Sequence, residues 1–442
     1  MLELPDYLYE FRTGISEIGK DSISIRGHDI VDLIKKSDFQ SVVNLLLTDN
    51  IPLDEERALL NAILTFLTLR ELPYATTKFL DLVSPASPLN SALASGLRGF
   101  EPRAERVRKA MISLKKGDFR GRRDTSSILL FDRSGEELAD RAHELHGQYI
   151  ESILKGGSSD PYEIIGASLL DMGYNIDTGS SLIYIGSLGA LTPYVLWRKH
   201  GKNQTDGGKK DRNFDPTNPL RPWSRYHKLI GKIPFTSAIF SLMVGHRVEE
   251  EILDKIFIAL SEGGINAPSS LLGRLSAQAK SSSCLECALH SISEFHPGAL
   301  SRVMYLYEAA VEEEGSVVKK IFDRSEKKSY VIPGFNETSF DSDPRAEVLL
   351  HEAQKSGIEG PYMDLAIKMD KERQKRKGLR IDVAGVAGAI LEELGLPWFA
   401  GDGILAMARS PGIAAHAIEE KSHSTYFTHR VRAKYVGPPR ST

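Results

Sequence analysis

Apolar residues recur at spacings of three and four along most of this 442-residue chain, and this periodicity limits the fold more than any other feature. Residues 38–47, 53–69 and 250–264 show it clearly, and Gly264 is where we expect the last of these helices to end. Alternation typical of strands is confined to DSISIRG (21–27), which predicts a short hairpin arm. The sequence therefore predicts a mostly helical fold.

Length and charge limit the domain organisation and the partners. A chain of 442 residues exceeds one small core, so we expect two domains or one large helical body with an inserted lobe. A net charge of -3, with 26% charged residues, is typical of a globular protein and disfavours nucleic acid as a partner. The start, MLELPDYLYEFR, is acidic where a secretory signal or transit peptide would be basic, which favours a cytoplasmic protein.

Several further segments predict ordinary structural roles. Residues 181–197 are apolar but short for a membrane span, and they contain Ser, Gly and Pro, so we expect a buried helix and no membrane contact. Cys284 and Cys287 have a C-x-x-C spacing without further ligands for zinc, which favours two buried thiols on a helix and no metal. Residues 198–228 predict a surface loop or insertion, and residues 368–380 a solvated helix face whose cations could also meet phosphates.

Four segments carry residues suited to catalysis or binding, each with a structural alternative. His296 precedes a helix predicted to begin at Pro297, where a neutral imidazole either donates to a carbonyl oxygen or simply caps. Asp382 precedes a helix rich in Ala and Gly, so it is either a general base or an N-cap. Arg409 lies among small residues and needs a partner, such as a carboxylate ligand. The basic segment 429–439 is either a functional arm or a solvated tail.

Together and in order, these segments resemble the citrate synthase family from about residue 12 onward, with an interruption mainly at 198–228. The motifs that carry the resemblance are SISIRGHDIVDL (22–33), EGGINAPSS (262–270), FHPGAL (295–300), IPGFNETSFDSDPRA (332–346), RIDVAGVAGAILEELGLP (380–397), GILAMARSPGIAAHAIEE (403–420) and RVRAKYVGP (430–438). The resemblance implies an all-α homodimer of two domains. Residues 1–295 and 387–442 would form the large domain, and residues 296–386 a small domain that closes over a cleft.

The resemblance also implies roles for individual residues, with acetyl-CoA as co-substrate and no prosthetic group. His296 falls where the family's histidine bonds the thioester carbonyl of acetyl-CoA, and Asp382 where its general base removes the α-proton. Arg345, Arg409 and Arg430 match arginines that hold the carboxylates of a 2-oxo acid, the last across the subunit interface. A loop whose backbone recognises the CoA adenine is matched by Val331, Pro333, Gly334 and Phe335.

Two departures from the family's pattern affect the half of the site that binds the keto acid. Gly263, in the motif that also supplies Asn266, stands where the family has a histidine ligand of oxaloacetate. Glu337 stands where the family has the histidine that polarises the ketone, and a carboxyl group could do that only if protonated. Cations expected near the CoA phosphates are replaced by Thr338 and Asp341, so other cations would be needed, for which the candidates are Lys319, Lys320, Lys327 and Lys328.

These features predict an active Claisen-type condensing enzyme that joins acetyl-CoA to a multi-anionic 2-oxo acid other than oxaloacetate, such as phosphonopyruvate. The alternatives are a citrate or 2-methylcitrate synthase that uses oxaloacetate, an enzyme that cleaves a citryl-CoA-like thioester, and a catalytically inactive homologue. Retention of His296, Asp382 and three arginines favours an enzyme over the last alternative.

Overall fold

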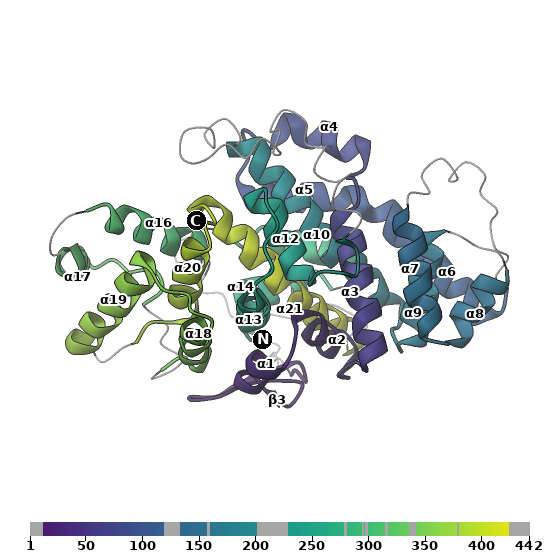
Figure 1. Cartoon of the computed structure of the whole chain (residues 1–442), viewed down its shortest axis with the longest axis horizontal. Helices are drawn as coiled ribbons and strands as arrows, with labels where there is room; N and C mark the ends of the chain where they lie inside the picture. The colour runs from purple at the N-terminus through teal and green to yellow at the C-terminus, as the bar shows by residue number, and fades with distance from the viewer. Residues whose placement is uncertain are drawn as a thin grey trace, which may run out of the picture.

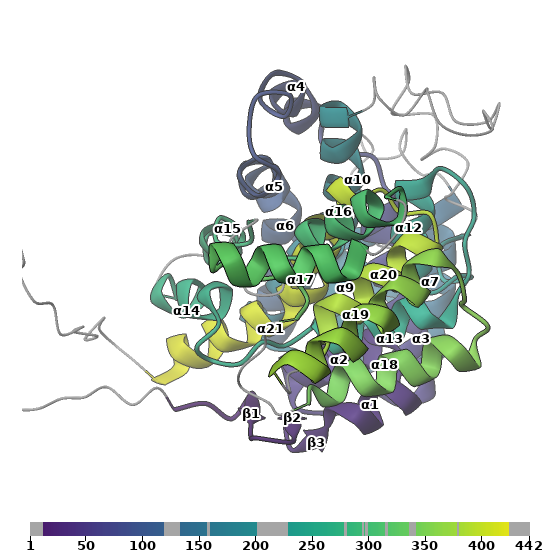
Figure 2. The same ribbon diagram turned by 90° about the vertical axis from the view of Figure 1, so that its left-hand side faces the viewer.

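The computed structural model describes residues 12–118, 133–156, 160–200, 229–277, 281–293, 296, 299–313, 317–335, 342–377 and 380–423. Within these ranges the only sheet is a three-stranded antiparallel one made of β1 (Ser16–Ile18), β2 (Ile23–Ile25) and β3 (His28–Asp29). Figure 2 shows this sheet at one edge of the molecule, beside α1 (Ile30–Lys36). The all-α class and the predicted hairpin arm are both confirmed.

The helices form a large body and a smaller group at one end (Figure 1). The smaller group comprises α16 (Leu300–Val311), α17 (Val317–Lys328), α18 (Pro344–Lys355), α19 (Pro361–Lys377) and α20 (Val383–Glu393). The body comprises α1, α2 (Phe39–Thr48), α3 (Asp54–Leu69), α4 (Tyr74–Val83), α5 (Leu89–Leu97), α6 (Glu101–Lys116), α7 (Arg133–Glu144), α8 (Gln148–Lys155), α9 (Pro161–Asp171), α10 (Ile176–His200), α12 (Phe235–Val244), α13 (Glu251–Leu260), α14 (Pro268–Leu275), α15 (Ser281–Leu289) and α21 (Gly401–His423), with short 3-10 turns η1 (Arg98–Phe100) and η4 (Trp398–Ala400).

The centre of the body is α10, which packs against α3, α5, α6 and α21. Two glycines let α3 approach closely, because a Cβ at Gly186 would lie 2.7 Å from the Leu67 side chain and one at Gly189 would lie 2.5 Å from Thr68 Oγ1. Among the residues that the structure describes, α10 is the one helix long and apolar enough to cross a membrane, and its apolar part is fully buried in the protein. The predicted buried helix is confirmed.

Two predicted helix ends are wrong. The helix predicted over 250–264 ends at Leu260, and its C-cap is Ser261 in a right-handed conformation instead of Gly264. The helix predicted to begin at Pro297 begins at Leu300, with Ala299 as its N-cap. After α13 the amides of Gly263 and Gly264 donate to the Glu262 side chain, and before α16 the amide of Ala299 donates to the carbonyl oxygen of His296 at 3.0 Å.

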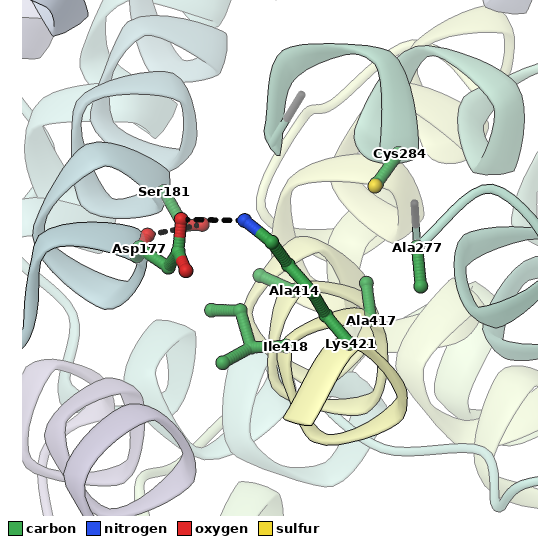
Figure 3. A pocket seen from close by; sticks show the side chains of 8 residues that line it. All are labelled: Asp177, Ser181, Ala277, Cys284, Ala414, Ala417, Ile418 and Lys421. Atoms are coloured by element: carbon green, nitrogen blue, oxygen red, sulfur yellow. Dashed lines mark hydrogen bonds and ion pairs between the residues drawn. The ribbon is translucent and has the colours of Figure 1, made fainter. Parts of the chain in front are cut away.

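The cysteine prediction is half right, since Cys284 is buried but Cys287 is exposed on α15. Cys284 lines a cavity of about 10 Å³, room for one water, between α10, α15 and α21 (Figure 3). Lys421 reaches across that cavity to Asp177 at 3.0 Å. Burial raises the pKa of the Cys284 thiol to about 11, so this sulfur is a packing group and not a reactive one. The described residues contain no group of three or more His, Cys, Asp or Glu side chains that could hold a metal ion.

The charged helix α19 is less solvated than its sequence predicts. Its Arg373 is buried and donates from Nε to the carbonyl oxygen of Phe335 at 3.2 Å. Asp370 is also buried and pairs with Arg380 at 2.9 Å, while Arg376 pairs with Asp323 at 2.7 Å. These ion pairs and hydrogen bonds join the helices of the small group. The sequence alone does not show whether such charged side chains pair inside the protein or face solvent.

Candidate active site

The loop between α13 and α14 begins with a fully buried carboxylate, Glu262. Its Oε1 accepts the amide hydrogens of Gly263 at 3.0 Å and Gly264 at 2.5 Å, and it lies 3.2 Å from His416 Nε2. Burial alone would raise the pKa of this carboxyl group. His416, Arg409 and the Gly264 amide outweigh burial and lower the pKa to about 2. A negative charge is therefore fixed beneath this loop at neutral pH.

Arg409 lies on α21 and is only 5% exposed. Its Nε donates to the carbonyl oxygen of Leu260 at 2.6 Å, and its guanidinium lies against Gly263. Burial lowers the pKa of Arg409, while Glu262 opposes that effect and Arg345 adds to it, giving about 10. Arg409 therefore stays charged at neutral pH, and its predicted need for a partner is met in part within the protein.

Arg345 reaches the same loop from the first turn of α18. Asp343, the N-cap of that helix, accepts from the Arg345 backbone N at 3.0 Å and from its Nε and Nη2, each at 2.9 Å. Pro344 follows Asp343 at the first helical position, where its fixed φ suits a helix start. Arg345 Nη1 also donates to the carbonyl oxygen of Glu262 at 3.4 Å. Arg345 and Arg409, two predicted site residues that are far apart in the sequence, therefore meet at one loop.

Asp382 is the N-cap of α20, and its Oδ1 accepts the amide hydrogens of Ala384 at 3.0 Å and Gly385 at 3.1 Å. The capping alternative is therefore confirmed. A carboxylate has about four acceptor sites on its two oxygens, so capping two amides and taking a proton are compatible. The role of general base stays a prediction.

Three consecutive amides around Asp382 are each held by a different segment. Ile381 N donates to Asp370 Oδ1 on α19 at 2.7 Å. Asp382 N donates to the carbonyl oxygen of Gly334 at 2.9 Å, and Val383 N donates to Asp343 Oδ2 at 3.0 Å. Asp343 therefore connects Arg345 directly to the start of α20. The position of Asp382 depends on all three segments.

The segment matched to an adenine-binding loop forms a tight turn that lies on α20. Phe335 N donates to the carbonyl oxygen of Ile332 at 3.3 Å, and Gly334 has a φ of 80°, a conformation that favours glycine. A Cβ at Gly334 would lie 2.8 Å from the Gly385 Cα. Phe335 is buried, Pro333 is partly buried and Val331 is 55% exposed. The turn therefore has a fixed backbone and one exposed end.

His296 is buried, and its Nε2 lies 3.2 Å from Ser269 Oγ near the start of α14. Asn266 is exposed in the turn that precedes α14, which the amide of Ala267 closes by donating to the carbonyl oxygen of Gly264 at 3.1 Å. The loop and helix start at 262–269 therefore contact three of the predicted site residues, His296, Arg345 and Arg409. Glu337, Thr338, Asp341, Arg430 and residues 201–228 lie outside the described residues.

Sequence reasoning missed two residues that organise this site, Asp343 and His416, and considered Glu262 only as a substitute for a histidine that the family's pattern has. Asp343 has a readable signal, because an Asp followed by Pro is the pattern of an N-cap and first helical residue. His416 follows Arg409 by two helical turns and so lies on the same face of α21. No pattern in the neighbouring sequence indicates that Glu262 is buried.

Comparisons with known proteins identify similar sequences and similar folds. Residues 224–432 match the family model of the citrate synthase C-terminal domain. The citrate/2-methylcitrate synthase of Bacillus subtilis (strain 168) is 26% identical over 263 residues, which cover 52% of this chain and 69% of that protein.

Solved structures match the fold over nearly its whole length. The citrate synthase of Thermotoga maritima MSB8 has a TM-score of 0.66 at 18% identity, covering 99% of this chain and 96% of that one. The citrate synthase of Thermoplasma acidophilum, in a ternary complex with carboxymethyl coenzyme A and oxaloacetate, has a TM-score of 0.65 at 16% identity, covering 99% and 96%. The family model spans Arg345, Asp382 and Arg409, so residues 224–432 are similar to the C-terminal domain of citrate synthases, and the whole chain has the citrate synthase fold.

Proposed function

We propose that this protein condenses acetyl-CoA with a 2-oxo acid and then hydrolyses the thioester of the product. The observation that carries the proposal is the convergence of Arg345 and Arg409 on Glu262 and Gly263, with Asp343 linking Arg345 to Asp382. Two buried guanidiniums within electrostatic reach of each other favour an anion between them. Such an anion would lie close to a carboxylate suited to proton removal.

In the proposed reaction, the Asp382 carboxylate removes a proton from the acetyl group while His296 donates a hydrogen bond to the thioester oxygen. Both are needed because the α-proton of a thioester is very weakly acidic and the enolate oxygen must be stabilised as it forms. The enolate carbon then bonds to the ketone carbon of the 2-oxo acid, and the new alkoxide takes a proton, a task we assign to Glu337. Water finally hydrolyses the thioester and releases CoA.

The acceptor that we propose is a di- or tri-anionic 2-oxo acid other than oxaloacetate, such as phosphonopyruvate. The charge of Arg345 is balanced by Asp343 at 2.9 Å, and Arg409 lies near the ionised Glu262. A strongly anionic acceptor therefore needs a further cation, and we assign that role to Arg430 of the partner subunit in a homodimer. The domain boundaries and a cytoplasmic location remain part of the same proposal.

Synthesis of citrate or 2-methylcitrate is the second candidate, because the Bacillus subtilis relative carries that name. Its acceptor would be oxaloacetate. Cleavage of a citryl-CoA-like thioester would use the same residues in reverse, since general acids and bases exchange roles when a reaction runs backwards.

The test is release of free CoA thiol from acetyl-CoA in the presence of oxaloacetate, phosphonopyruvate, 2-oxoglutarate or pyruvate. We expect release that requires an acceptor and that falls by about 10²- to 10⁴-fold in Asp382→Asn, the usual loss for a missing general base. Asparagine keeps the capping oxygen, so the fold is preserved.

The matched control is Asp29→Asn, because Asp29 caps α1 in the same way, accepting from Val31 N at 2.7 Å. Its activity should equal that of the wild type. Lack of thiol release with every acceptor would refute condensation. Full activity in Asp382→Asn would leave Asp382 with its capping role alone, and a clear preference for oxaloacetate would favour the second candidate.

A further inference from the structure

The backbone conformation at position 263 does not require glycine. Its φ lies outside the left-handed region, in contrast to the neighbouring Gly264, which has a φ of 81°. The backbone at 263 could therefore carry any side chain. The obstacle is Arg409, because a Cβ at position 263 would lie 1.8 Å from Arg409 Nη1 and 2.8 Å from its Cζ.

The guanidinium of Arg409 cannot move aside without loss. Its Nε is committed to the carbonyl oxygen of Leu260 at 2.6 Å, its side chain is buried, and the ionised Glu262 attracts it from beneath. Arg345 lies near enough to repel it. A side chain at position 263 would therefore break the hydrogen bond to Leu260 or separate two buried opposite charges.

The Arg409 guanidinium also has N–H groups that could bind a ligand. Among the described residues, its one hydrogen bond is from Nε to Leu260, which leaves the four N–H groups of Nη1 and Nη2 for another acceptor. Because buried N–H groups without an acceptor are costly, these donors favour a ligand with several oxygens. Arg409 Nη1 lies 1.8 Å from where a Cβ at position 263 would be, so Nη1 occupies the space of a side chain there.

We propose that Gly263 determines acceptor specificity by leaving space for the Arg409 guanidinium, so that the acceptor meets a charged planar fork in the space that a side chain at position 263 would fill. A histidine there would offer at most one or two N–H donors, whereas this fork offers four on two nitrogens. The fitting ligand class is a 2-oxo acid whose distal group is an anion with several oxygens. This inference rests on the proposed function and names the feature that selects its acceptor.

The test measures binding of di-anionic 2-oxo acids and of pyruvate by calorimetry to four proteins: the wild type, Gly263→Ala, Arg409→Lys and the double variant. For the best di-anionic acceptor, we expect Gly263→Ala to raise the Kd by about 10- to 100-fold, as for loss of a charge-assisted hydrogen bond. Pyruvate affinity and the KM for acetyl-CoA should change little. In the double variant the effects should not add, because lysine has no Nη1 for the new Cβ to displace.

The matched control is Gly14→Ala, since a Cβ at Gly14 meets no atom closer than 3.7 Å. It should bind like the wild type, and thermal melting of every variant shows whether the fold is intact. Equal Kd values for the wild type and Gly263→Ala, or additive effects in the double variant, would overturn this inference and leave condensation standing. Tight acceptor binding without thiol release in the wild type would overturn the proposed function alone, and no binding of any 2-oxo acid would overturn both.

Discussion

Replacing Glu262 by glutamine tests whether the buried charge beneath the candidate site stabilises the protein. Glutamine has nearly the same shape and keeps an oxygen that can accept from the amides of Gly263 and Gly264. It removes only the negative charge beside Arg409 and His416. Any loss of stability therefore reports on electrostatics and not on packing.

The magnitude follows from the pKa of this carboxyl group, which falls from 4.5 to about 2 on folding. At about 1.4 kcal/mol for each pKa unit, the lowered pKa contributes on the order of 3 kcal/mol to the free energy of unfolding. Because the folded pKa is lowered, this contribution is fully present above about pH 4.5 and is lost as the pH falls toward about 2. The advantage of the wild type over Glu262→Gln should therefore shrink by about 1 kcal/mol between roughly pH 7 and pH 3.5.

The assay is reversible urea unfolding of the wild type and Glu262→Gln across that pH range, with Glu151→Gln as the control. Glu151 lies at the surface of α8, where its pair with Lys155 at 2.8 Å is solvated. Its replacement should change stability little at any pH. A difference between the wild type and Glu262→Gln that stays constant with pH, or a Glu262→Gln variant as stable as the wild type, would refute the reasoning.

Three further predictions follow from the same site and from the small group of helices. Asp343→Asn should lower the free energy of unfolding by about 3–5 kcal/mol, because it breaks a buried ion pair, and should also slow thiol release; a stable variant with normal kcat would contradict this. Gly334→Ala should raise the KM for acetyl-CoA about tenfold or more, because its φ of 80° is strained for alanine and its Cβ would meet the Gly385 Cα at 2.8 Å. An unchanged KM for acetyl-CoA, or an equal rise in the KM for the 2-oxo acid, would count against the adenine-loop role. For Glu392, burial and neighbouring carboxylates raise the pKa to about 8, so stability is lost as the pH rises from about 4.5 toward that value. Glu392→Gln should therefore melt higher than the wild type at alkaline pH and show little gain at acidic pH, and an equal gain at both would contradict the assignment.

Much of the fold could be predicted from the sequence because its helices are amphipathic or wholly apolar. The periodicity predicted α2 and α3 to within a residue or two, and the composition of residues 181–197 predicted the buried part of α10. Helix ends were harder, as Gly264 and Pro297 show. A glycine or proline signals where a helix can end, whereas the loop after α13 is fixed by a buried carboxylate that accepts the amides of the loop.

The candidate site could be predicted residue by residue but not as an arrangement. Arg409 was expected to need a partner, and it has one in the Leu260 carbonyl, yet no local pattern indicates that Glu262 is buried and ionised nearby. Asp343 was overlooked because its role joins α18 to α20, which only tertiary packing brings together. The buried polar residues of α19 were misjudged for the same reason.

The contact between Gly263 and Arg409 also restricts the order in which this chain can change over evolutionary time. A side chain at position 263 has no room while the guanidinium is in place, and Arg409 lies beside its negatively charged neighbour, Glu262. A substitution that places a histidine at position 263 would therefore be selected against while Arg409 keeps its present position. Such a substitution first requires a change at Arg409 or Glu262, so we expect these positions to change together.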